Sequence, residues 1–131
     1  MKGRFLMDTH ALVFWSMAQH VSEGFIEYFD EQSRQGNVLV SSISFWEVAL
    51  LARKGRLEIQ DVYGWKDELL EHSSIKLIDP TAADMIDSVL LPDHHADLFD
   101  RLLIAQALRE NARLVTRDQL FARYAVETFW M

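Results

Sequence analysis

Short apolar runs alternate with longer amphipathic segments along the chain, and this alternation predicts strands that are each followed by one or two helices. Strands are expected at residues 4–8, 38–42, 75–79 and 112–116, with a last apolar piece, VETFW, after a turn at 119–124. Helices are expected at residues 10–17, 23–35, 43–56, 64–72, 81–90 and 97–110. Ser22 is a plausible N-cap for the second helix, and Thr81 with Asp84 resembles a capping box that opens the fifth.

Strands that alternate with helices predict an α/β fold with a mostly parallel sheet covered by helices on both faces. The length, 131 residues and 15.2 kDa, favours a single domain that spans residues 1–131. In sheets of this kind, functional sites form outside the carboxyl ends of the strands. Side chains at those ends are therefore the first candidates for chemistry.

The composition excludes several classes of site. The chain has no Cys, which rules out disulfides, thiolate zinc sites and cysteine nucleophiles. No apolar run approaches the roughly 18 residues of a membrane span, and the apolar run near the N-terminus is too short for a signal peptide, so we expect a cytoplasmic protein with no membrane partner. The formal net charge of −7 gives no hint of nucleic-acid binding, so a bound metal or a local basic patch would have to supply positive charge.

One carboxylate falls on the apolar side of a predicted helix. At helical spacing, Asp100 shares a face with Leu103, Ile104 and Ala107, and that face should point into the protein. An isolated buried charge is costly, so this position needs a compensating partner.

Three further acids are expected at the same edge of the sheet. Asp8 closes the first strand, Asp118 lies two residues past the fourth, and Glu47 lies on an inward helix face near a helix start. Two carboxylates about 4 Å apart repel by roughly 4 kcal/mol at an effective dielectric near 20. If Asp8, Glu47, Asp100 and Asp118 converge, divalent cations can neutralise them, and an all-oxygen cluster suits Mg²⁺ or Mn²⁺.

Each acid also has a purely local explanation. Glu47 could complete a capping box begun by Ser44, and Asp100 could be a first-turn acid behind an Asp97 cap. Asp8 and Asp118 could be turn residues, which is the commonest role of an Asp after a strand.

Four segments carry a resemblance to a known family. They are LMDTHALVFW (residues 6–15), SSISFWEVALLARKGRL (41–57), LPDHHADLFDRLLIAQAL (91–108) and LVTRDQLFARYAVETFW (114–130). At these segments the chain resembles the PIN-domain family, and more narrowly the VapC-type toxin ribonucleases of type II toxin–antitoxin systems. One departure is Leu98, which stands where many relatives have Pro.

The resemblance implies a three-layer α/β/α sandwich with a mostly parallel central sheet. It implies a Mg²⁺- or Mn²⁺-dependent endoribonuclease whose acids match Asp8, Glu47, Asp100 and Asp118, with Thr116 orienting the site. It also implies a homodimer held inactive by a cognate antitoxin. Hydrolysis of an RNA phosphodiester by metal-activated water would need no side-chain nucleophile.

Other residues near these motifs have two roles open to them. Asp97 could be a helix cap that supports the site or a metal ligand in place of Asp100, and Arg101 could contact substrate phosphate or pair with an acid. Arg53, Lys54 and Arg56 form the one compact basic patch, which could contact RNA or only complement a helix C-terminus. His94 and His95 suggest zinc, but no second helical His completes a set, so a surface or loop-packing role is favoured.

Two other functions compete with the nuclease. A non-catalytic PIN-fold protein-binding module would keep the fold and act through a partner. A phosphoryl-acceptor signalling domain also has acids at strand ends, but it requires a Lys after a late strand, and the last Lys here is Lys76.

Overall fold

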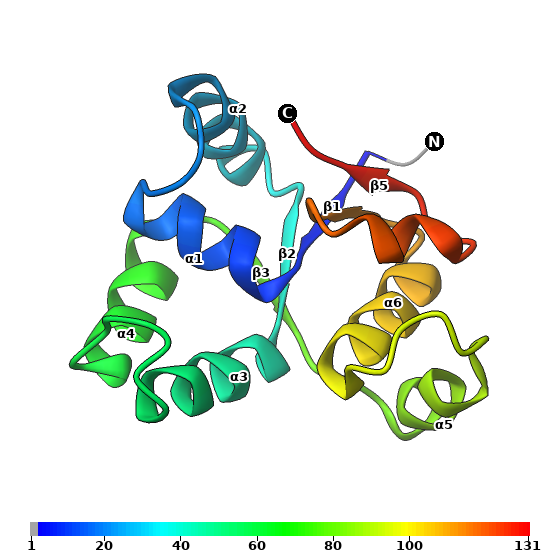
Figure 1. Cartoon of the computed structure of the whole chain (residues 1–131). Coiled ribbons are helices and arrows are strands. Elements are labelled where there is room, and N and C mark those ends of the chain that lie inside the picture. The colour runs from blue at the N-terminus through cyan, green and yellow to red at the C-terminus, as the bar shows by residue number, and fades with distance from the viewer. Residues whose placement is uncertain (1–2) are drawn as a thin grey trace.

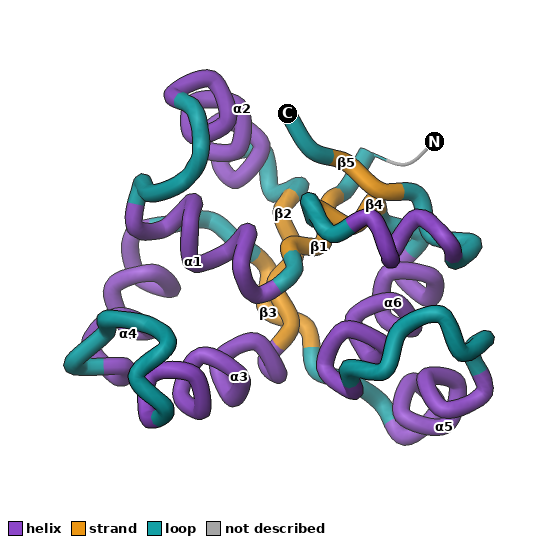
Figure 2. The backbone as a smooth tube through the Cα atoms, in the orientation of Figure 1, coloured by secondary structure: helices purple, strands orange, loops and turns teal. Residues whose placement is uncertain are grey.

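Five strands form one parallel sheet in the order β3-β2-β1-β4-β5 in the computed structural model, which describes residues 3–131 (Figures 1 and 2). The strands are β1 (Phe5–Met7), β2 (Val38–Ser41), β3 (Lys76–Ile78), β4 (Arg113–Val115) and β5 (Thr128–Phe129). The helices are α1 (Thr9–Met17), α2 (Glu23–Arg34), α3 (Ser42–Arg53), α4 (Val62–His72), α5 (Ala82–Leu90) and α6 (Leu98–Glu110), with a 3₁₀ helix η1 (Gln119–Arg123). The predicted parallel α/β fold is confirmed.

Helices cover both faces of the sheet. Alternate residues of β1 enter different cores: Phe5 and Met7 pack with residues of α1 and α2, whereas Leu6 packs with residues of α6. Figure 1 shows α1, α2 and α4 on one side of the strands and α6 on the other, with α5 packed outside α6. These are the three layers that the sequence resemblance implied.

The predicted caps and stops explain most element boundaries. The Ser22 side chain accepts a hydrogen bond from Phe25 N, and Thr81 with Asp84 forms the predicted capping box of α5. Helix α3 ends at Arg53 and not at residue 56 as predicted, because Gly55 adopts a left-handed conformation (φ +73°) that stops the helix.

The strand order places a switch point at the centre of the sheet. From β1 the chain moves outward through β2 to β3 and then returns to β4 on the other side of β1. The carboxyl ends of β1 and β4 therefore lie side by side, and ligands of parallel sheets bind at such points. In residues 3–131, no helix has the length and apolar character needed to cross a membrane.

Candidate active site

Asp8 and Asp118 follow the two strands at the switch point. Asp8 is 8% exposed and caps α1, with its Oδ1 accepting a hydrogen bond from Ala11 N at 2.8 Å. Asp118 caps η1, with its Oδ1 accepting from Leu120 N at 3.0 Å, and its own N–H donates to the Thr116 hydroxyl at 3.1 Å. Both acids are thus helix caps and not the turn residues that the sequence suggested as their local role, and each has a second carboxylate oxygen free of the cap.

Glu47 lies on the second turn of α3, which begins at this edge of the sheet. The capping box suggested for Ser44 and Glu47 is wrong, because the cap of α3 is Ser41, whose side chain accepts from Ile43 N. The Ser44 hydroxyl instead accepts a hydrogen bond from Thr9 at 3.1 Å. Among the side-chain atoms of residues 3–131, Glu47 Oε1 is one of the few that are buried with no hydrogen-bond partner.

Asp100 occupies the first turn of α6. Asp97 caps this helix, since its Oδ1 accepts from Asp100 N at 3.0 Å, and the predicted cap is confirmed. The Asp100 side chain is 21% exposed, and its Oδ2 lies 2.9 Å from His95 Nε2.

The charges of these acids act on one another. Burial, which is the largest cause, and the charges of Asp97, Glu47, Asp8 and Asp118 together raise the pKa of Asp100 to about 8. Because all of these carboxylates act on Asp100, the structure brings the four predicted acids together with Asp97.

The pKa values of the other two inward acids also rise. Burial raises the pKa of Asp8; hydrogen bonds to Thr116 and Ala11 oppose this, and Asp118 adds to it. The expected hydrogen bonding of Thr116 to an acid is thus present. Burial likewise raises the pKa of Glu47, although the Thr9 hydroxyl lowers it.

Within the described residues, no Lys or Arg neutralises this cluster, although the charge of His10 lowers the pKa values of Asp8 and Glu47. Among residues 3–131, no Lys or Arg forms a salt bridge with Asp8, Glu47, Asp100 or Asp118. Carboxylate oxygens from four segments, one of them buried without a partner, fit a hard divalent cation of the Mg²⁺ or Mn²⁺ type. The positive ends of α1, α3 and α6 also point toward this edge and favour negative charge there.

His95 is the residue that sequence reasoning misplaced. A surface role is wrong for His95, whose side chain is 11% exposed, but its ring does pack within the loop region, against Phe121. Its Nε2 also lies 2.9 Å from Asp100 Oδ2 and 3.2 Å from Asp118 Oδ2. The three side chains form a group whose ligand-type atoms lie within 4.8 Å of one another. A usable signal was present, because the loop that leads into α6 must bring His95 to the carboxyl edge where Asp100 lies.

Arg101 pairs with an acid, since its Nη1 lies 3.8 Å from the exposed Asp93 Oδ1, but most of its contacts are with backbone carbonyls. It is 6% exposed, and its guanidinium donates hydrogen bonds to backbone carbonyls at the end of α5 and in the loop that follows it: Ser88, Val89, Leu91, Pro92 and His95. The suggested contact with RNA is therefore not supported, and Arg101 instead fixes the loop that carries His95.

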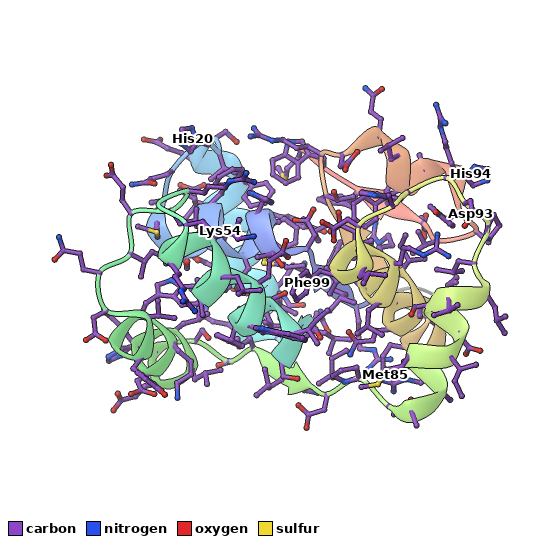
Figure 3. The ribbon with its side chains drawn as sticks, turned by 60° about the horizontal axis from the view of Figure 1, so that its bottom comes forward. His20, Lys54, Met85, Asp93, His94 and Phe99 are labelled. Atoms are coloured by element: carbon purple, nitrogen blue, oxygen red, sulfur yellow. The ribbon has the colours of Figure 1, made fainter. Side chains whose placement is uncertain are left out.

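The basic patch lies at the C-terminal end of α3. Arg53, Lys54 and Arg56 are all exposed, and Lys54 is visible in Figure 3 on the same face of the molecule as Phe99 of α6. An RNA contact by this patch stays a prediction.

Comparisons with known proteins agree with this geometry. The PIN-domain family model matches residues 5–127. The chain belongs to the PIN-domain family. It is 33% identical over 121 residues to Ribonuclease VapC22 of Mycobacterium tuberculosis, covering 87% of this chain and 86% of that protein. The VapC-type resemblance found in the sequence is thus confirmed.

Solved structures show the same PIN fold. The structure of VapBC2 from Rickettsia felis bound to a promoter DNA fragment superposes with a TM-score of 0.72 at 19% identity, over 95% of this chain and 96% of that chain. FitAcB from Neisseria gonorrhoeae gives a TM-score of 0.64 at 20% identity, over 96% of each chain. The four acids all lie within the matched PIN domain.

Proposed function

We propose that this PIN-domain protein is an endoribonuclease that requires Mg²⁺ or Mn²⁺, and that it is the toxin of a toxin–antitoxin pair in the cytoplasm. One observation carries the proposal: at the switch point of the sheet the charges of Asp8, Glu47 and Asp118 act on Asp100, and within residues 3–131 no Lys or Arg forms a salt bridge with any of the four. The 33% identity to a VapC ribonuclease supports RNA as the substrate.

The chain's own residues supply the framework for hydrolysis. Asp8, Glu47, Asp100 and Asp118 hold the divalent cation, directly or through water, while Thr116 and Asp97 orient them. A bound cation of this class activates water for attack on a phosphodiester and stabilises the departing oxygen. Arg53, Lys54 and Arg56 lie on an exposed helix end where they can attract the RNA backbone.

Protein partners form the second part of the proposal. A solved structure of the same fold is a toxin–antitoxin complex from Klebsiella pneumoniae, which supports an antitoxin that binds this chain. Four large apolar side chains are exposed on α5: Met85, Ile86, Val89 and Leu90. Clustered apolar exposure of this kind is typical of a protein interface, and we assign this one to a homodimer.

The decisive experiment compares Asp8→Asn with the wild-type chain on single-stranded RNA. We expect cleavage with Mg²⁺ or Mn²⁺, none with EDTA, and a loss of about a thousandfold or more in Asp8→Asn, because several kcal/mol of transition-state stabilisation depend on the bound cation. Asn still caps α1, so the fold should persist. Expression of the wild-type chain alone should also arrest growth.

Asp87→Asn is the matched control, because Asp87 is an exposed acid on α5. Cleavage that survives EDTA and Asp8→Asn would contradict the proposal. Absence of cleavage in a chain that still binds a protein partner would favour the non-catalytic binding module instead.

A further inference from the structure

His95 is held at the acidic cluster from three sides. Its backbone carbonyl accepts a hydrogen bond from Arg101 at 3.0 Å, and its ring packs against Phe121 with centroids 5.5 Å apart. The backbone N–H of Asp97 donates to His95 Nδ1 at 3.2 Å. The ring is therefore fixed in place by groups that belong to the loop, α6 and η1.

The Asp97 contact decides which ring nitrogen carries the proton. A nitrogen that accepts a hydrogen bond from an N–H has its lone pair in use and bears no hydrogen, so the proton of the ring lies on Nε2. Nε2 is the atom that lies 3.2 Å from Asp118 Oδ2, in hydrogen-bonding geometry, and 2.9 Å from Asp100 Oδ2.

This tautomer does not suit a metal ligand. A metal-binding imidazole coordinates through a bare nitrogen and usually donates its other N–H to an oxygen. In His95 the other nitrogen, Nδ1, faces the backbone N–H of Asp97. Coordination of a metal through Nε2 would move the ring proton to Nδ1, where it would point at that N–H. The proximity of His95, Asp100 and Asp118 is thus better explained by hydrogen bonding than by a three-residue metal site.

We propose that His95 is a positioning residue that donates its Nε2–H to Asp118, beside Asp100, and so holds the carboxylates of α6 and of the β4–η1 turn in one arrangement. The inference rests on the proposed function, since it concerns the same acidic site. Asp118 then has both oxygens engaged, one by Leu120 N and one by His95, and its carboxylate is oriented before any cation binds.

The first test does not depend on cleavage or on metal. We expect ¹⁵N NMR of the EDTA-treated full-length chain to give, for His95, the chemical shifts of an imidazole with a proton on Nε2 and none on Nδ1. A proton on Nδ1 would overturn the inference and would leave the proposed nuclease function untouched.

The second test compares three variants of the same loop. His95→Leu removes the donor, His95→Gln keeps an amide N–H at a similar reach, and His94→Leu removes the neighbouring imidazole. His94 is an exposed residue whose ring packs on Tyr124, and Figure 3 shows it at the outer edge of the molecule beside Asp93.

We expect His95→Leu to lower both the Mn²⁺ affinity and kcat by about 10- to 100-fold, the usual range for residues that support metal ligands, with KM for RNA little changed. His95→Gln should restore most of this loss, and His94→Leu should match the wild type. A His95→Gln variant as impaired as His95→Leu would contradict the donor role. So would an unchanged or higher Mn²⁺ affinity in His95→Leu.

Spin-echo spectroscopy of the Mn²⁺-loaded wild type separates the remaining outcomes. We expect no directly bonded nitrogen; a ¹⁴N coupling that disappears in His95→Leu would make His95 a ligand and overturn the inference alone. A wild-type chain that binds no Mn²⁺ would instead overturn the proposed function, and this inference with it.

Discussion

Asp84 and Asp100 occupy the same position in two consecutive helices, and their surroundings are opposite. Each is the third residue after an N-cap, in the sequences Thr81-Ala-Ala-Asp84 and Asp97-Leu-Phe-Asp100. Asp84 is 1% exposed, accepts a hydrogen bond from Thr81 N at 2.9 Å, and accepts Arg109 Nε at 2.9 and 3.0 Å. Burial raises its pKa, but Arg109 and Thr81 bring the pKa below the usual value.

Within the described residues, Asp100 has no Arg or Lys partner of this kind. Its cap, Asp97, uses its backbone N–H for His95, so Asp100 does not complete a capping box. Its charged neighbours are other acids and the imidazole of His95, and its pKa rises to about 8. One acid is therefore neutralised within the chain, while the other belongs to a cluster that needs charge from outside.

This difference separates structural acids from functional ones. A carboxylate removed from water must find a cation, hydrogen-bond donors or a proton. Asp84 has both a cation, Arg109 of α6, and a hydrogen-bond donor, the Thr81 N–H, and its contact with Arg109 joins α5 to α6. Asp100 can be neutralised only by a proton or by a bound cation. An acid whose pKa is shifted in this way within a site is a candidate for a functional role.

The largest expected effect is on the pH dependence of the metal-free protein. The pKa of Asp100 is higher in the folded than in the unfolded chain. Its contribution to the free energy of unfolding is therefore fully present below about pH 4 and is lost as the pH rises toward 8. Urea unfolding in EDTA should show the free energy of unfolding falling between pH 5 and 8 by on the order of 3 kcal/mol.

Asp100→Asn should remove most of this fall and make the metal-free protein more stable at pH 8. Added Mn²⁺ should stabilise the wild type at pH 8, because a ligand bound only by the folded state shifts the equilibrium toward it. A wild-type profile that is flat in EDTA would mean that Asp100 is as well neutralised as Asp84.

Asp84→Asn should change the free energy of unfolding by a smaller amount, and should lower it where Asp100→Asn raises it. Asn can still accept the Thr81 hydrogen bond but cannot pair with the Arg109 guanidinium, so we expect a loss of about 2 kcal/mol, a value reduced for the partial exposure of Arg109. Urea unfolding at pH 7 with and without Mn²⁺ should give the same loss. The exposed Asp87→Asn provides the baseline, and a metal-dependent loss would show that the two acids are not independent.

The sequence predicts the fold better than it predicts this distinction. Apolar alternation located the strands to within one or two residues, and short-range caps at Ser22, Thr81 and Asp97 depend only on neighbours in the chain. Convergence of the four acids followed from their places at strand ends and helix starts. The contrast between Asp84 and Asp100 could not be predicted, because it depends on Arg109 and on the course of the loop before α6.

His95 and Arg101 show the same limit. Arg101 follows Asp100 directly, yet its guanidinium points away from the acidic cluster and donates hydrogen bonds to carbonyls at the end of α5 and in the loop that follows it. His95 approaches the acids because that loop is fixed in this way. The position of His95 just before α6 indicates which edge of the sheet it reaches, but the contacts of both residues form only after the chain has folded.

The smallest effect is expected from the basic patch, which tests whether cations that are merely nearby can act as Arg109 does. Arg53, Lys54 and Arg56 are exposed and form no salt bridge with the acids in the described chain, so changing all three to Gln should leave stability within about 0.5 kcal/mol and the pH profile in EDTA unaltered. RNA affinity, measured in an Asp8→Asn background by fluorescence anisotropy, should fall several-fold at low salt and less at high salt, because phosphate contacts release counterions. If the triple variant instead loses more stability than the wild type toward pH 8, the basic patch already neutralises part of the acidic cluster. The charge of Asp100 would then be balanced within the chain, as that of Asp84 is.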